Sequence, residues 1–261
     1  DSGKPLTSGA DGTVQSAAWS AYLQAIEPYK FDIMIYDGTD TTVQQAMISF
    51  IRRIADEAGQ YAQLVASGLT NPDSRFVINV DGTVLTAQQC TWWVGGAEAG
   101  ALYNQSLTYA QYPGAVSASP LMTNSQYEAA LQAGKLVFFA EDGQVKVEQD
   151  INSLVTYTTD IGKVFRKNRV MRLCNTIAND VYAQFSANFI GVVNNNAAGR
   201  SQFKAAIVGY LLDIQGNQGI QNFTADDVEV LPGEDIDAIL VNIAIQVVDS
   251  VEKIYLTIEV S

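Results

Sequence analysis

The sequence predicts an α/β protein, with a mostly parallel sheet flanked by helices in the first half. An α+β C-terminal domain with a terminal β-strand arm follows. Short apolar strands alternate with a helix between residues 31 and 80, which is the order of a βαβ unit and requires a parallel sheet. Two long helical segments then follow each other, and the chain ends in two segments of alternating apolar and polar residues. We therefore expect an α/β domain over residues 1–145 and an α+β domain over residues 146–261.

In the first half most elements have a recognisable start or stop. A helix over residues 17–26 stops before Pro28, which cannot continue it. An apolar strand over residues 31–36 precedes a helix over residues 41–58, which Gly59 closes. The other elements expected here are strands at 61–65 and 75–80, a small-residue helix at 86–102, a helix capped by Thr123 or Asn124 and ended by Gly134, a buried strand at 136–140 and its hairpin partner at 144–147.

In the second half the spacing changes from that of strands to that of long helices. Apolar periodicity predicts one helix of about 30 residues, or about 45 Å, over residues 159–190, and another over residues 198–215. Strands are expected over residues 227–231, 238–249 and 252–260, because the last two segments alternate strictly between apolar and other side chains. This order of helices and strands predicts an α+β unit.

Composition excludes several classes of function. The chain has no histidine, which removes Ser-His-Asp and Cys-His catalysis and every metal site built on histidine. Its net charge of −13 repels phosphate backbones and anionic lipid, so we expect no nucleic acid and no membrane as partners. Cys90 and Cys174 are too few for a zinc site and are expected as buried residues in a reducing compartment. The chain shows no secretory leader and begins at Asp1, so a trimmed chain or a fragment is one reading.

Several patterns could carry chemistry, and each has a simpler structural reading. The segment 95–100 lacks the Lys and Ser/Thr of a phosphate loop, so we favour a helix face that allows close packing. Asp32 with Asp37 could form a hydrolase pair and Trp92 with Trp93 could stack on a sugar, but no pattern fixes either pair in a cleft. We therefore expect no catalytic site, no cofactor and no metal. A carboxylate-based hydrolase or a carbohydrate-binding module on the α/β half remains the alternative.

Charge is unevenly distributed along the second half. Five of the ten positions 163–172 are basic and none is acidic, whereas six of the twelve positions 226–237 are acidic. Residues 166, 169 and 172 would share a broad arc of one helix. A basic helix face and an acidic loop favour docking between copies of the chain. Solvated charges and ion pairs within one chain are the alternative, and the sequence leaves both open.

The last strand is the second indication of an interaction. The apolar residues of segment 252–260 fall on one face, with Tyr255, Thr257 and Glu259 on the other. A long, unpaired strand of this kind is an aggregation hazard. We therefore expect it to pair within its own sheet or to be donated to the sheet of a neighbour.

Short motifs spread over nearly the whole chain match those of one known family. Residues 6–12 resemble a Leu-x-Gly-Gly-x-Asp-Gly segment that leads into the first helix, with Ser8 at a position that is usually glycine. Residues 93–100 and 104–109 are similar to an Ala-Gly helix and the Ser-x-Thr-Tyr segment after it. Further matches are Asp150–Leu154 with Asp-Ile-Asn-Thr-Leu, 165–180 with a long helix, 189–200 with the following loop and 249–255 with a last arm. In this order they resemble the sheath protein of contractile phage tails, especially its prophage and phage-tail-like bacteriocin branch.

The resemblance implies a structural protein that stacks as six-fold rings in a helical cylinder around a tail tube and contracts to drive the tube through the host envelope. Its implied partners are other copies of the chain, the tail tube protein, and baseplate and tail terminator proteins. The implied location is a virion tail or phage-tail-like particle, assembled in the bacterial cytoplasm. Terminal arms join neighbours in this family, which also has an upstream arm and further N-terminal sequence before the residues matched here. The residues expected at the subunit interface are Lys163, Arg166, Arg169, Arg172, Asp249, Glu252, Lys253, Ile254, Tyr255, Leu256, Ile258 and Val260.

Overall fold

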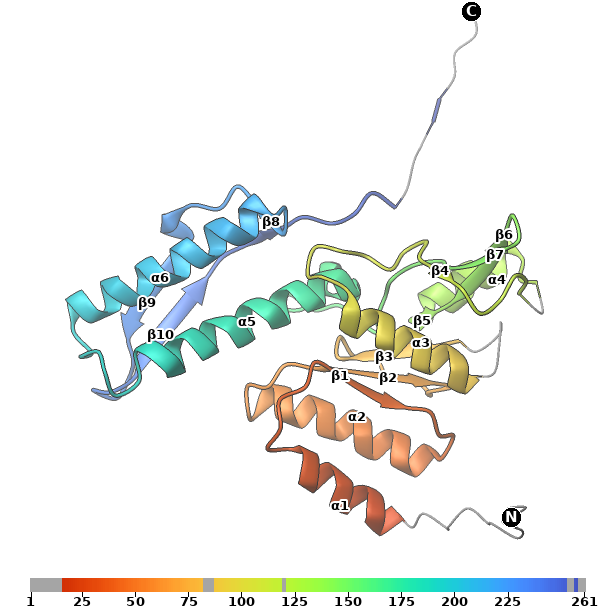
Figure 1. Cartoon of the computed structure of the whole chain (residues 1–261), viewed down its shortest axis with the longest axis horizontal. Helices are drawn as coiled ribbons and strands as arrows, with labels where there is room; N and C mark the ends of the chain where they lie inside the picture. Colours follow the sequence, from red (N-terminus) through yellow and green to blue (C-terminus); the bar gives the residue numbers. More distant parts are fainter. Residues whose placement is uncertain (1–15, 82–86, 119–120, 253–255, 258–261) are drawn as a thin grey trace, which may run out of the picture.

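The computed structural model describes residues 16–81, 87–118, 121–252 and 256–257. Its first half contains α1 (Ser16–Ile26), β1 (Ile33–Tyr36), α2 (Thr41–Asp56), β2 (Gln63–Ser67), β3 (Val77–Val80), α3 (Ala87–Gly100), β4 (Gln111–Tyr112), α4 (Asn124–Gln132), β5 (Lys135–Leu136), β6 (Phe138–Glu141) and β7 (Gln144–Val147). Strands β1, β2, β3 and β5 form a parallel sheet in that order. Helices α1 and α2 cover one face and α3 the other (Figure 1), which confirms the α/β architecture of this half.

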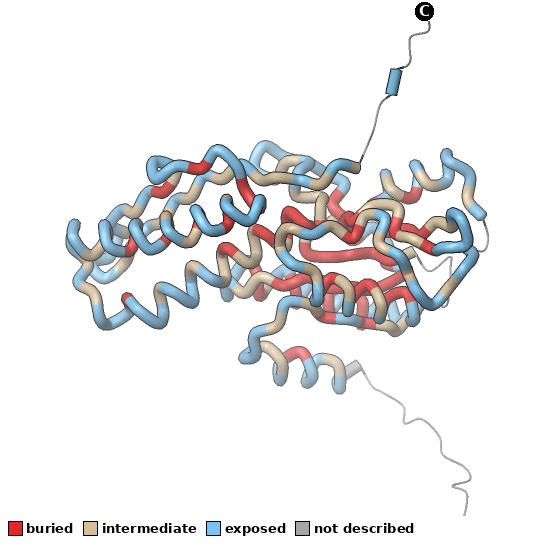
Figure 2. Tube along the Cα trace, turned by 45° about the horizontal axis from the view of Figure 1, so that its top comes forward, coloured by how far each residue is buried: buried red, intermediate tan, exposed pale blue. Residues whose placement is uncertain are grey.

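Helix α2 shows how the sequence produces this packing. The Asp40 carboxylate caps the helix, since its Oδ1 accepts the backbone N–H groups of Thr42 at 2.8 Å and Val43 at 3.3 Å. Apolar residues at spacings of three and four then make one stripe, and Ile51 and Ile54 are completely buried in it. The stripe packs on the central sheet, which is the most deeply buried part of the chain in Figure 2.

The expected single strand at 136–140 is wrong, because the chain changes sheets within it. Leu136 pairs in parallel with Val80 of β3, whereas Phe138 pairs antiparallel with Val147 of β7. Val137 lies between the two strands, is completely buried and accepts the N–H of Glu148 at 2.9 Å. The predicted hairpin with 144–147 is confirmed, and β4 joins it to give the order β4-β7-β6. One apolar run therefore connects the parallel sheet to the antiparallel one.

Gly134 lies where α4 turns into β5, and we expect it to tolerate no side chain. Its φ is +72°, and a Cβ there would lie 2.7 Å from the Ser153 carbonyl oxygen. Gly134→Ala should therefore lower the free energy of unfolding by roughly 2–5 kcal/mol, through backbone strain and overpacking, in urea denaturation. Gly143 has the same φ, but a Cβ added there would meet no atom within 4 Å, so Gly143→Ala should cost only about 1–2 kcal/mol. Equal losses in the two variants would contradict the steric explanation.

The second half contains η1 (Lys163–Arg166), α5 (Asn168–Asn188), α6 (Ala197–Gly216), β8 (Ile220–Gln221), η2 (Ala225–Asp227), β9 (Val228–Pro232), β10 (Ile239–Ile243) and β11 (Gln246–Val247). Helices α5 and α6 pack against the β9–β10 hairpin, with Leu211 completely buried and the Phe189 and Phe203 rings 4.7 Å apart. This confirms an α+β C-terminal region. The position of the domain boundary near residue 145 stays a prediction.

Two predicted elements of this half are shorter than expected. The helix over 159–190 begins only at Asn168, because the backbone before it pairs with another segment: Asn152 binds the carbonyl groups of Arg166 and Phe165, and Ile151 forms a β-bridge with Lys167. The strand over 238–249 is divided in two. Its first part, β10, pairs with β9, whereas β11 pairs with β8, so the chain changes partner after Ile243.

Candidate linking site at the root of the terminal segment

The predicted basic residues do not form one helix face. Lys163 is exposed and lies with Arg166 in η1, before α5 begins. Arg166 donates to the Leu131 carbonyl oxygen at the end of α4, which also accepts the backbone N–H of Gly134 at 2.9 Å. Arg169 and Arg172 lie in the first turns of α5 and point into the molecule. The broad arc expected from helical spacing is therefore wrong for Arg166.

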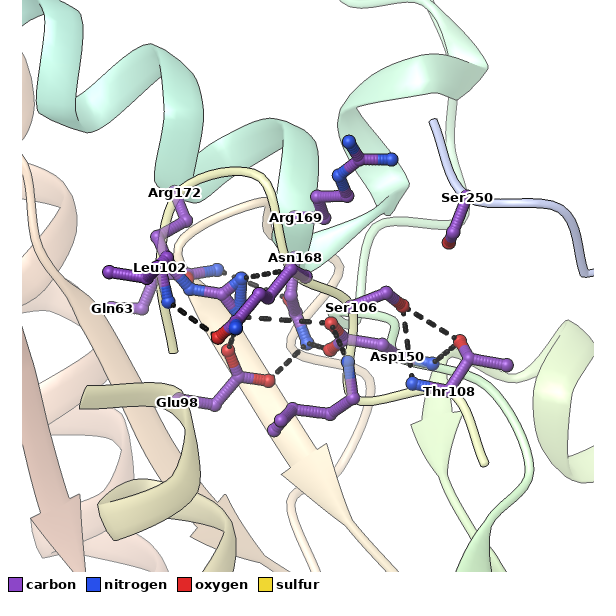
Figure 3. A network of polar contacts seen from close by, with 12 residues as sticks. Gln63, Glu98, Leu102, Ser106, Thr108, Asp150, Asn168, Arg169, Arg172 and Ser250 are labelled. Atoms are coloured by element: carbon purple, nitrogen blue, oxygen red, sulfur yellow. Dashed lines mark hydrogen bonds and ion pairs between the residues drawn. The ribbon is translucent and has the colours of Figure 1, made fainter. Parts of the chain in front are cut away.

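Arg172 contacts two buried carboxylates of its own chain (Figure 3). Its Nη2 binds the carboxylate of Glu98 on α3 and lies 3.7 Å from Asp150 Oδ2. Its Nη1 donates to the Gln105 carbonyl oxygen at 3.0 Å. The side chains of Glu98 and Asp150 are 0% and 1% exposed, so Arg172 provides the positive charge closest to two negative groups removed from water.

Asn168, also buried, joins the two carboxylates. Its Nδ2 donates to Glu98 Oε1 at 3.1 Å and to Asp150 Oδ1 at 2.8 Å, and its Oδ1 accepts from Gln63 Nε2 at 3.3 Å. Asp150 Oδ2 also accepts the backbone N–H of Leu107 at 2.9 Å. The cluster thus connects α3, the loop after it, the segment after β7, β2 and α5 (Figure 3).

Burial raises the pKa of Glu98 well above its ordinary value, and the neighbouring charge of Asp150 raises it further. Arg172 acts in the opposite direction, but it is shared with Asp150. Two carboxylates facing one guanidinium in a buried space favour a neutral Glu98.

The chain comes back to this cluster just before its end. Glu252 forms an ion pair with Lys167, and its Oε1 accepts from Thr108 Oγ1 at 2.8 Å. Asp249 lies 3.9 Å from both Lys167 and Arg169. The Glu252 side chain is only 7% exposed, so this contact is more than a pair of solvated charges. We call residues 249–252 the root of the terminal segment.

Beyond the root, the predicted linking strand lies mostly outside the described residues. Lys253, Ile254 and Tyr255, and residues 258–261 with Ile258 and Val260, are in this group. Leu256 is described and is 78% exposed, and Val251 before it is 86% exposed. The fold of the chain therefore leaves these two described apolar side chains uncovered.

The alternative sites of the sequence are not assembled. Asp32 precedes the four-residue strand β1 and Asp37 follows it, so the two carboxylates lie at opposite ends of that strand. Trp92 is half-exposed and donates to Asp37 Oδ2 at 3.0 Å, whereas Trp93 packs on Tyr112. The two tryptophans therefore do not form a shared surface for stacking on a sugar. In the described ranges no three Cys, Asp or Glu side chains gather as a metal site, and no helix is long and apolar enough to span a bilayer.

Sequence reasoning missed the buried carboxylates. The available signal was Glu98, the only charged residue in the small-residue segment from Ala87 to Gly100. Gly95 of the same helix packs against Ile35 of β1 without room for a Cβ, which keeps α3 close to the sheet. A lone charge on a closely packed helix requires a buried partner.

Comparison with family models decides which family this fold belongs to. The central domain of phage tail sheath protein matches residues 12–153, and the phage tail sheath C-terminal domain matches residues 160–261. The chain belongs to the phage tail sheath protein family. Proteins of this family and their structural neighbours are structural sheath proteins and not enzymes, so the hydrolase alternative is wrong.

Two relatives of this sheath protein come from Bacillus subtilis. The uncharacterised protein YqbK is 36% identical over 99% of this chain and 59% of its own length, and the phage-like element PBSX protein XkdK is 32% identical over 98% and 58%. The crystal structure of a sheath tail protein from Desulfitobacterium hafniense is 40% identical over 97% of this chain and 61% of that one, with a TM-score of 0.86. The chain thus spans about three-fifths of the length of these relatives.

A more distant structure shares the fold of the sheath protein. The helical sheath of the anti-feeding prophage in its contracted state is 15% identical and covers 96% of this chain and 76% of that one, with a TM-score of 0.73. The contracted sheath therefore contains the same arrangement of central sheet, helices and C-terminal α+β unit.

Proposed function

We propose that the protein is a subunit of a contractile tail sheath that stacks as six-fold rings around a tail tube. Contraction of the cylinder drives the tube through the host envelope. Its partners are other copies of itself, the tail tube protein, and baseplate and tail terminator proteins of a virion tail or phage-tail-like particle assembled in the bacterial cytoplasm. The observation that carries the proposal is the terminal segment, which is fixed at its root by ion pairs while the apolar Val251 within the root and Leu256 beyond it are exposed.

Residues 253–260 are the proposed link between subunits. Their alternation gives an apolar face of four side chains, which can pack on a core while the backbone pairs with the edge of a sheet. The β9–β10 hairpin is a two-stranded sheet, and Leu231 and Leu240, which face each other across it, are both exposed. An added strand would extend such a sheet and cover its apolar residues.

Beside this hairpin lies a groove of about 660 Å³, lined mainly by apolar residues of the α5–α6 connection and of the turn between β9 and β10. It is at the C-terminal end of α5, whereas the root lies at the helix's N-terminal end. Along α5 the distance from Lys167 to Phe185 is about 27 Å, which the terminal segment would cover only when fully extended to its last residues. The apolar face of the terminal segment therefore fits the groove of another copy better than the groove of its own chain.

The charged residues of the predicted interface divide into two groups. Arg169, Arg172, Asp249 and Glu252 are in ion pairs within the chain, whereas Lys163 is exposed. We propose that Lys163 and the exposed atoms of the half-buried Arg166 contact the acidic segment 226–237 of a neighbouring subunit. Single exposed pairs are worth about 0–1 kcal/mol, so such contacts set register and salt sensitivity more than strength.

Electron microscopy of the complete natural protein tests this function. We expect hollow tubes with a regular axial repeat, and we expect Lys163→Glu to make their formation more sensitive to salt. A protein that stays monomeric under all conditions, including in the presence of tube and baseplate proteins, would contradict the proposal.

A further inference from the structure

The ion pairs at the root and in the buried cluster form two groups, and only the buried one has unequal charges. The buried group has two carboxylates, Glu98 and Asp150, and one cation, Arg172, which leaves an excess of one negative charge. At the root, Asp249 and Glu252 are balanced by Lys167 and Arg169. Because Glu98 and Asp150 are removed from water, an uncompensated charge is costly there. A single proton makes the buried group neutral.

The geometry indicates which carboxylate takes this proton. Asp150 accepts N–H groups from Leu107 and Asn168. Glu98 accepts from Asn168 and Arg172, but it is completely buried and lies against Asp150, and burial is the main cause that raises its pKa. A protonated Glu98 can donate to the ionised Asp150 and still contact Arg172.

A short chain of hydrogen bonds links the cluster to the root. The backbone N–H of Asp150 donates to Thr108 Oγ1 at 2.9 Å, which Figure 3 shows, and the Thr108 hydroxyl donates to Glu252 Oε1 at 2.8 Å. Ser106 Oγ, which donates to Thr108 Oγ1 at 3.1 Å, fixes the direction of that hydroxyl. A displacement of Asp150 therefore changes the position of the Thr108 hydroxyl and, through it, the hydrogen bond to Glu252 at the root.

We propose that Glu98 and Asp150 share one proton, and that this proton stabilises the contact between the root of the terminal segment and the central domain. When it leaves, two adjacent buried carboxylates share Arg172, Asp150 is repelled from its position, and Thr108 loses its alignment with Glu252. The root is then held only by Lys167 and Arg169. The terminal segment becomes pH-sensitive at the point where it leaves the fold.

The surroundings of Glu98 allow this titration to occur. A cavity of about 120 Å³ beside it is large enough for water and gives the proton a route to solvent. The charged and titratable groups that face it are Asp150 from the segment after β7, Arg172 from α5, and, around the cavity, Asp32, Tyr61 and Tyr103. Arg172 is the one cation among these five groups, so it alone favours loss of the proton.

The direction of the pH effect follows from the raised pKa of Glu98. In the unfolded chain Glu98 ionises near its ordinary value of 4.5, whereas in the fold it stays protonated to higher pH. The contribution of this proton to stability is therefore fully present below pH 4.5 and is lost as the pH rises through the raised pKa. Each unit by which the pKa is raised corresponds to about a tenfold change in the equilibrium.

The rate of trypsin cleavage after Lys253 measures how easily the root detaches from the fold, because the protease binds residues 249–252 only in an extended form. Release of peptide 254–261 is followed by mass spectrometry between pH 6 and 9 for the wild type and Glu98→Gln, which has no proton to lose. The ratio of the wild-type rate to the variant rate cancels the pH dependence of trypsin itself. We expect this ratio to rise with pH by about tenfold or more, whereas a constant ratio overturns the proposal.

Two further variants keep the test independent of the folding of Glu98→Gln. In Asp150→Asn, Glu98 ionises beside Arg172 without repelling a second carboxylate, so release should lose most of the pH dependence that the wild type shows. Glu128→Gln removes one charge from the exposed face of α4 and should follow the wild type at every pH. If Asp150→Asn and Glu128→Gln have the same profile, the carboxyl pair does not control the root. Tube formation is not measured, so this result does not depend on the sheath function.

Discussion

Deletion of residues 253–261 from the complete protein should abolish sheath tubes while leaving the subunit folded. The described core ends at the root, so the deletion removes no buried contact that the structure shows. What it removes is the proposed link. Electron microscopy should show monomers or short rings in place of cylinders, and circular dichroism should show an unchanged fold.

The energetics of this link explain why the effect is large only in the assembly. A paired strand makes about 4–6 backbone hydrogen bonds of roughly 0.5–1.5 kcal/mol each, and each buried apolar side chain adds about 1.5–3 kcal/mol. Ordering the segment costs about 1–2 kcal/mol per residue, which offsets much of the gain. The net free energy of one link is therefore modest, but many such links repeated through a cylinder stabilise the whole cylinder.

A pair of single substitutions separates the apolar face from the length of the segment. Leu256→Lys places a charge on the apolar face, whereas Thr257→Lys places the same charge on the opposite face. We expect the first to prevent tubes and the second to allow them. Tubes of normal length from the deletion variant, or equal effects of the two substitutions, would show that the segment is not the link.

Arg172→Met should be the most destabilising single substitution in the polar cluster. It leaves Glu98 and Asp150 buried with Asn168 but without the guanidinium. Breaking a buried ion pair by removing one partner costs about 3–5 kcal/mol, which in a chain of this size lowers Tm by roughly 6–20 °C. Calorimetry or thermal circular dichroism measures the shift.

Arg53→Met is the matched control for this experiment. Arg53 also binds a glutamate, Glu27, but the two side chains are 40% and 38% exposed, so solvent replaces the lost contact. We expect little change in Tm for this variant. In the Arg172→Met background, Glu98→Gln should recover part of the loss at high pH, because it leaves Asp150 as the one buried charge of this pair whatever the pH. Equal Tm shifts for Arg172→Met and Arg53→Met would show that the cluster contributes no more than a surface pair.

The parts of the fold that the sequence predicted are those determined by local patterns. The βαβ unit follows from the apolar stripe of α2 and the apolar runs of β1 and β2, and the hairpin from the turn at Asp142 and Gly143. The breaks at Val137 and Lys167 were missed because both depend on distant partners. Val137 lies between strands that pair with β3 and β7, and Lys167 pairs with Ile151.

The candidate site was predicted only in part for the same reason. The density of basic residues at 163–172 was visible, but helical spacing gave no sign that Arg172 turns inward to Glu98, 74 residues away. The choice between docking to another copy and pairing within the chain depends on which acids come near. For Arg172 the fold brings two of them together from α3 and from the segment after β7.

Helix α5 runs from the buried cluster to the far end of the C-terminal unit (Figure 1). Its 21 residues span about 31 Å, so the helix can act as a lever whose fulcrum is the cluster around Asn168. A rotation of about 10° at that fulcrum displaces the other end by about 5 Å, close to the spacing of about 4.8 Å between neighbouring strands. A small angular change in the interior would thereby move the hairpin by about one strand width.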